Sequence, residues 1–210
     1  MNRRGVLIAA AMLAVGTGIS PSYAAAQGAG DPKAIVQSFY DALLETMQQG
    51  EELGFDGRYT KLEPVIHQTF DVPVMAKIAI GPEWTGFTPD EKDRMLQAFD
   101  QYMVTTYAAR FKSYKGQRFE VGAVKQPAEN RALVETKLIR SNGEPIALSY
   151  LFRPGEGGTW KIIDVYLSGA ISEMARMRSD FSATVTTGGA DALIAALDQK
   201  ILDIRKEPEQ

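Results

Sequence analysis

The residue types that most often carry chemistry are scarce in this chain of 210 amino acids. It has no cysteine, which excludes a disulfide framework, a thiolate metal site and a cysteine nucleophile. Its one histidine, His67, excludes any site that needs two imidazoles. No serine lies in the Gly-x-Ser-x-Gly pattern of a nucleophile elbow. Because His67 lies in the middle of a predicted helix beside Ile66, we interpret it as a structural side chain.

Carboxylates can do acid–base work without histidine, and Asp164 is the acid that stands out. It is the only acidic residue in an otherwise apolar strand pattern from Trp160 to Leu167. We expect a hydrogen-bonded, structural carboxylate near a strand end. The alternative is an extracytoplasmic enzyme that uses Asp164 with a tyrosine such as Tyr150. A metal site built almost wholly of carboxylates is uncommon, so no metal is expected.

Two glycine clusters could cradle a phosphate group. Gly155, Gly157 and Gly158 fall between two predicted strands, and Gly188 and Gly189 fall between two predicted helices. Neither cluster follows a strand and opens a helix, as a nucleotide-binding loop does. A hairpin turn and a helix stop explain them, and no cofactor is expected.

The overall composition is that of an ordinary globular protein, with 45% hydrophobic and 23% charged residues. The formal net charge of -3 argues against nucleic acid as a partner. One domain is the default for a chain of this length.

Residues 1–26 have the order of a secretory signal. A basic start at Arg3 and Arg4 precedes an uncharged apolar stretch over 5–19, and small residues follow at 24–26. Cleavage is expected after Ala24 or Ala26, and the sequence leaves an ordinary and a twin-arginine export signal open. The chain is therefore predicted to be exported from the cytoplasm, with a single domain over 27–205 and a frayed tail over 206–210.

Helical spacing and caps predict three helices before residue 82. The first begins at Asp31-Pro32 and ends at Gly50, with a loop over 54–57. The second covers 59–70, with a kink or restart at Pro64, and the third runs from an Asp71 cap to a stop at Gly81-Pro82.

A capping box marks the next helix. Thr88 and Glu91 have the required spacing, Pro89 stands at the first helical position, and an apolar stripe then runs from Met95 to Phe111. This is the best local signal in the chain, and it predicts a long helix.

From Gln117 the hydrophobic period changes from helical to two. Alternating segments around 119–123, 132–138, 146–152 and 160–167, joined by short turns, predict a four-stranded antiparallel meander. The last strand is apolar on both faces, which predicts cover on both sides. Two helices over 168–187 and 191–205 complete an α+β protein.

The remaining apolar and aromatic residues could fill a core or line a cavity, and periodicity does not separate these two cases. Several of them stand in an order that resembles a known family: Phe70-Asp71, Met75-Ala76, Gly81, Trp84, Phe99, Thr106-Tyr107-Ala108, residues 160–165, Gly169, Arg178-Ser179, Phe181 and Gly189. Over residues 31–200 the chain resembles the periplasmic phospholipid-binding proteins of the Mla lipid-transport pathway, the toluene-tolerance family. The stretch 164–173 is similar to the branch associated with hopanoid biosynthesis.

The resemblance implies helices wrapped around one face of a curved four-stranded antiparallel sheet, with a deep apolar cavity between them that holds lipid tails. It implies a monomeric carrier that takes a phospholipid or hopanoid between an inner-membrane lipid transporter and an outer-membrane lipoprotein complex. For the hopanoid branch, the expected inner-membrane neighbour is a transporter of the resistance-nodulation-division type. The sequence gives no direction of transport.

A lipid carrier does not need the catalytic residue types that this sequence lacks. Burying one methylene contributes about 0.8 kcal/mol, so exposing roughly 30 methylenes of two acyl chains costs on the order of 20 kcal/mol. A carrier needs an apolar lining and no nucleophile, metal or base. The residues expected to bind lipid are Phe70, Met75, Ile78, Trp84, Phe99, Tyr102, Met103, Tyr107, Leu148, Tyr150, Ile162, Val165, Tyr166 and Met174. A ligand-free interaction module is the other open alternative.

Overall fold

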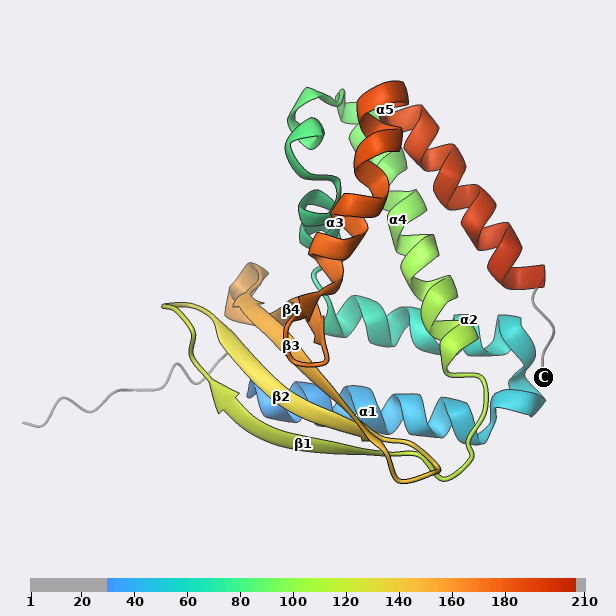
Figure 1. Ribbon diagram of the computed structural model, residues 1–210, viewed down its shortest axis with the longest axis vertical. Helices are drawn as coiled ribbons and strands as arrows, with labels where there is room; N and C mark the ends of the chain where they lie inside the picture. The colour runs from blue at the N-terminus through green and yellow to red at the C-terminus, as the bar shows by residue number, and fades with distance from the viewer. Residues whose placement is uncertain (1–29, 207–210) are drawn as a thin grey trace, which may run out of the picture.

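A computed structural model describes residues 30–206 of the chain (Figure 1). The predicted signal, residues 1–26, and the predicted tail beyond Lys206 lie outside the described residues, so both stay predictions. The first half of the chain forms the helices α1 (Pro32–Gln48), α2 (Gly50–Thr69), α3 (Val72–Ile80) and α4 (Pro89–Arg110), with a short 3₁₀ helix η1 (Gly81–Gly86) before α4.

The second half forms one antiparallel sheet and a long helix. The elements are β1 (Arg118–Lys125), β2 (Ala132–Ile139), β3 (Pro145–Pro154), the 3₁₀ turn η2 (Glu156–Gly158), β4 (Trp160–Leu167), β5 (Ile171–Ser172) and α5 (Glu173–Lys206). The strand order is β1-β2-β3-β4-β5, so each strand pairs with its neighbour in the chain. The predicted α+β class is confirmed, with one strand more than expected.

The predicted caps explain where the front helices begin. Asp31 accepts a hydrogen bond from the Lys33 backbone N–H at 3.0 Å, and Asp71 accepts one from Val74 at 3.2 Å. At the start of α4, the Thr88 hydroxyl accepts from the Glu91 N–H, and the Glu91 carboxylate accepts from the Thr88 N–H at 2.7 Å. These bonds satisfy backbone donors that a helix end leaves without partners.

The loop predicted over 54–57 is wrong in its extent, because α2 begins at Gly50 and only one residue interrupts it. Gly54 has non-helical φ and ψ of 59° and -175°, whereas the backbone stays helical at Pro64. The first turn is held from a distance: the buried Arg58 guanidinium donates to the Gly50 carbonyl at 2.7 Å and to the Ala108 carbonyl at 2.9 Å. This contact with α4 outweighs the local preference of glycine for loops.

The helix predicted from Ser168 begins five residues later. Ser168 and Gly169 adopt positive φ angles of 51° and 78°, which turn the chain back so that β5 pairs with β4. The Ser172 hydroxyl then accepts a hydrogen bond from the Ala175 N–H at 2.9 Å and caps α5. The predicted break between the last two helices is confirmed at Gly189, whose non-helical φ and ψ of 66° and -158° interrupt α5.

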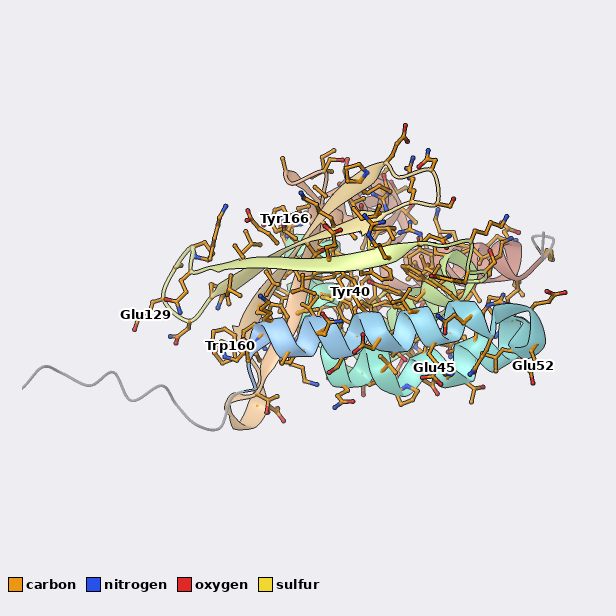
Figure 2. All side chains as sticks on the ribbon, turned by 90° about the horizontal axis from the view of Figure 1, so that it is seen from below. Tyr40, Glu45, Glu52, Glu129, Trp160 and Tyr166 are labelled. Atoms are coloured by element: carbon orange, nitrogen blue, oxygen red, sulfur yellow. The ribbon has the colours of Figure 1, made fainter. Side chains whose placement is uncertain are left out.

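Helices cover one face of the sheet. Figure 2 shows α1 lying along this face with Tyr40 between helix and sheet, where its ring stacks on Phe119 of β1 at 4.1 Å between centroids. The other face of the sheet carries polar pairs such as Lys125 and Glu135. β1 is the outer strand, and its pairing with β2 is interrupted by a bulge between Val121 and Val124.

The helices α3, α4 and α5 form an arm that rises from the β4 side of the sheet (Figure 1). In this arm α5 packs against both α3 and α4, and the Arg178 guanidinium donates two hydrogen bonds, of 2.8 and 2.7 Å, to the Ile78 carbonyl at the end of α3. Ile162 to Val165 of β4 are all buried, which confirms cover on both sides of that strand. No helix in the described range has the length and apolarity needed to span a bilayer.

Candidate functional site

An apolar cavity of about 120 Å³ opens between the sheet and the helical arm. Its lining comes from α3, α4, β3, β4 and α5. The lining residues are Met75, Phe99, Tyr102, Met103, Thr106, Tyr107, Arg110, Phe111, Leu148, Tyr150, Val165, Leu167, Glu173, Met174, Arg176 and Met177.

Methionine and aromatic side chains form the inner walls of the cavity. Met75 of α3, Phe99 and Met103 of α4, and Met174 of α5 are buried, and each also belongs to the hydrophobic core. The thioether side chain is flexible and polarisable, so it adapts to ligands of varied shape. The cavity is therefore an extension of the core rather than a separate surface hollow.

Stacked aromatic rings close the cavity toward α1 and α2. The rings of Tyr107 and Phe111 stack at 5.7 Å with an interplanar angle of 15°. Behind Tyr107 lie Phe39 and Phe70, whose ring centroids are both 5.7 Å from that of Tyr107. Burial raises the pKa of Tyr107 above its ordinary value.

Tyr150 is buried beside a hydrogen-bonded pair of hydroxyls. The Tyr40 hydroxyl lies 2.5 Å from the Thr136 hydroxyl, and Thr136 donates to the Leu148 carbonyl at 3.2 Å. Burial raises the pKa of Tyr150 and raises that of Tyr40 to about 12. The ring centroids of Tyr40 and Tyr150 are 5.8 Å apart, and Tyr150 contributes an aromatic surface to the cavity.

Three charged residues line the cavity: the exposed Arg110 and Arg176, which mark its mouth, and the buried Glu173. Arg176 forms ion pairs of 2.9 Å with the buried Glu173 and 2.8 Å with Asp180. Arg110, in the last turn of α4, is exposed and has no hydrogen bond or ion pair with any residue between 30 and 206. At the mouth, the Arg176 guanidinium thus has protein partners, and the Arg110 guanidinium has none among residues 30–206.

Nine of the fourteen residues expected to bind lipid line this cavity. They are Met75, Phe99, Tyr102, Met103, Tyr107, Leu148, Tyr150, Val165 and Met174. They come together because α4 presents every third or fourth residue to the cavity, while β3 and β4 present alternate residues.

The other five lie elsewhere. Phe70 is behind Tyr107, and Ile162 is a fully buried core residue opposite Phe152 on β3. Ile78 lines a separate hollow with Lys77 and Arg178, and Trp84 lies in η1.

Tyr166 points away from the cavity. It pairs with Ser149, whereas Val165 pairs with Tyr150, so the two side chains leave β4 on opposite faces. Figure 2 shows Tyr166 across the sheet from Tyr40.

Seven lining residues were not among those expected: Thr106, Arg110, Phe111, Leu167, Glu173, Arg176 and Met177. Phe111 lies one turn beyond Tyr107, and Leu167 lies two residues beyond Val165. Helical and strand periodicity could therefore have found these two. Arg110 follows the same helical spacing on α4, whereas Glu173 and Arg176 carry no such signal, because in the sequence they do not differ from any exposed glutamate or arginine.

The two residues considered for catalysis are engaged elsewhere. His67 Nε2 lies 2.7 Å from Asp100 Oδ1 on the surface. Asp164 accepts hydrogen bonds from the Val165 N–H, the Ser172 hydroxyl and the Met174 N–H, at 2.8, 2.6 and 3.2 Å. Across residues 30–206, no three His, Asp or Glu side chains cluster in a way that could hold a metal ion.

The glycine clusters have the structural roles that were expected of them. The Gly155 N–H donates to the Thr159 carbonyl at 2.7 Å and closes the turn between β3 and β4. Gly157 and Gly158 take positive φ angles of 68° and 80° in the same turn.

An α+β fold that encloses an apolar cavity with a charged mouth defines a class of proteins that bind apolar ligands. The model of one such family, described as MlaC protein, matches residues 37–199. The chain therefore belongs to the MlaC family, and the resemblance noted in the sequence is confirmed. Its structure is similar to that of a phospholipid-binding protein from Ralstonia solanacearum, solved in complex with a phospholipid. The TM-score is 0.73, with 23% identity over 84% of this chain and 99% of that one.

Proposed function

We propose that the protein is a periplasmic lipid carrier that holds the hydrocarbon of a phospholipid in the cavity between its sheet and its helical arm. The observation that carries the proposal is the lining: most of its residues are apolar or aromatic, and the two arginines among them are exposed at the mouth. Membership of the MlaC family and the fold shared with a phospholipid-binding protein support it. Hopanoid is the second candidate ligand, since a triterpenoid also requires an apolar lining.

The size of the cavity implies that its walls move when a lipid binds. A cavity of about 150 Å³ accepts a benzene molecule, and this one measures about 120 Å³. Two acyl chains need far more room, so α4 and α5 must move away from the sheet to admit them. The methionines of the lining allow this repacking. The turn at Ser168 and Gly169, next to β4, is a suitable hinge.

The carrier moves its lipid between an inner-membrane transporter and an outer-membrane lipoprotein complex. A passive cavity has only an affinity, so the direction of transport comes from these partners. The predicted signal at 1–26 supports export to the periplasm, where both membranes can be reached. Neither step requires a catalytic residue or a cofactor.

The test is to identify what the protein carries. The full chain is expressed in bacteria, the processed protein is purified without detergent, and its organic extract is analysed by mass spectrometry. About one phospholipid per protein is the expected result, and a hopanoid-producing host tests the second ligand. Protein that carries no lipid and takes up none from phospholipid vesicles would refute the proposal.

A further inference from the structure

We propose that Arg110 binds the phosphate of the lipid head group, so that the carrier selects phosphate-bearing lipids over neutral lipids with the same acyl chains. This inference rests on the proposed function, and it adds a polar subsite to the apolar cavity. The ligand chemistry is a phosphodiester attached to hydrocarbon.

The position of Arg110 places it where a head group must lie. Thr106 and Tyr107 precede it by four and three residues on α4, so all three share one face of the helix. All three line the cavity, and Arg110 is the exposed one. A lipid whose tails fill the apolar interior therefore leaves its polar end beside this guanidinium.

Arg110 also has its donors available. The other cation of the mouth, Arg176, is engaged by Glu173 and Asp180. Arg110 forms no such bond with any described residue, and its planar guanidinium suits two-point binding of a phosphate oxygen pair. Its charge reaches the cavity wall, because it partly offsets the rise in the pKa of Tyr107 that burial causes.

A helix C-terminus is favourable for any cation, and this gives Arg110 a purely structural alternative. That interaction supports the helix but leaves the N–H donors unused. A structural role predicts a change in stability with no change in which lipid is bound. The head-group role predicts the opposite, so the two are separable by experiment.

The experiment compares Arg110→Gln, Arg110→Lys and the wild type. Arg140→Gln serves as the matched control, because Arg140 is an exposed arginine after β2 that does not line the cavity. Each processed protein is incubated with excess vesicles that contain phosphatidylglycerol and diacylglycerol with identical acyl chains. The protein is then re-isolated, and the ratio of the two bound lipids is measured by mass spectrometry.

We expect Arg110→Gln to lower the ratio of bound phosphatidylglycerol to diacylglycerol about tenfold, the size of one charge-assisted hydrogen bond. Arg110→Lys should keep part of the preference, and Arg140→Gln should behave as the wild type. Millimolar inorganic phosphate alone should not displace bound phosphatidylglycerol, because it lacks the hydrocarbon that anchors the ligand.

An unchanged ratio in Arg110→Gln would overturn the inference, as would an equal loss of both lipids. Displacement by inorganic phosphate would overturn it too, because the site would then be one for a free anion. Failure of the wild type to load either lipid would instead refute the proposed function, so the two failures are distinguishable.

Discussion

The hydroxyl of Tyr40 on α1 lies 2.5 Å from the hydroxyl of Thr136 on β2, in a part of the core that both residues bury. Tyr150 of β3, which lines the cavity, packs against Tyr40 with ring centroids 5.8 Å apart. The bond therefore joins a helix to the sheet directly behind the site. Because the phenols here are buried, the free energy of unfolding depends on pH in the alkaline range.

We predict a loss of stability between pH 10 and pH 12. The pKa of Tyr40 is about 12 in the folded protein and about 10 when unfolded, so the unfolded chain loses its proton first as the pH rises. The stability is fully present below pH 10 and falls by about 2–3 kcal/mol over this window. Guanidinium unfolding curves from pH 8 to pH 12 measure it.

Tyr40→Phe should flatten part of this decline and cost about 1 kcal/mol at neutral pH through the lost hydrogen bond. Tyr114→Phe is the control, because Tyr114 is exposed. The same pH dependence in Tyr40→Phe and wild type would show that Tyr40 does not contribute.

Charge introduced into the cavity wall should lower lipid loading. Val165→Asp or Tyr107→Arg places a charge among apolar walls, where it must either stay hydrated or displace the ligand. We expect less lipid per protein by mass spectrometry, with soluble protein still recovered. Ala147→Asp is the control, since Ala147 is exposed on the opposite face of β3. Full loading in both cavity variants would contradict this placement of the site.

Asp164 should act as a structural acid. Tyr150 pairs with Val165 and Leu151 pairs with Asp164, so Tyr150 and Asp164 point to opposite faces of the sheet and cannot act together. Asp164→Asn replaces one acceptor oxygen with a donor and should lower the free energy of unfolding by about 1–3 kcal/mol. Thermal unfolding checks it, with the exposed Asp198→Asn as control. An Asp164→Asn protein of unchanged stability would count against this role.

Gly50→Ala should be strongly destabilising, by about 3 kcal/mol or more, as expected when overpacking meets backbone. A Cβ at position 50 would lie 2.0 Å from the Lys112 carbonyl oxygen, and backbone atoms cannot easily move away. Gly86→Ala is the matched control, because a Cβ there meets nothing within 4 Å. Equal melting temperatures for the two variants would refute the close approach of Gly50 to the Lys112 backbone.

The sequence predicted those features whose causes are local. The Thr88–Glu91 capping box and the alternation of β2 to β4 depend on near neighbours, and the structure has them as expected. The start of α2 was missed because it depends on the chain at Ala108 and Lys112, which is far away in the sequence and contacts Arg58 and Gly50. The start of α5 was missed because Ser172 is positioned by pairing with β4.

The candidate site likewise has one part that could be predicted from the sequence and one part that could not. The stripe of α4 from Phe99 to Tyr107 could be read from periodicity, although periodicity alone did not separate a lining from a core. The mouth could not be predicted, since the difference between Arg110 and Arg176 lies in their partners. Those partners are set by how α4 and α5 meet in space.

The two borders of the sheet limit how other chains can attach to this protein. The bulge between Val121 and Val124 twists β1, which also carries Arg118, Glu120 and Lys125, and β5 is only two residues long. Short, bulged and charged edges are poor templates for an added strand. Polymerisation of the molecule by edge-to-edge strand pairing is therefore disfavoured at both borders of the sheet.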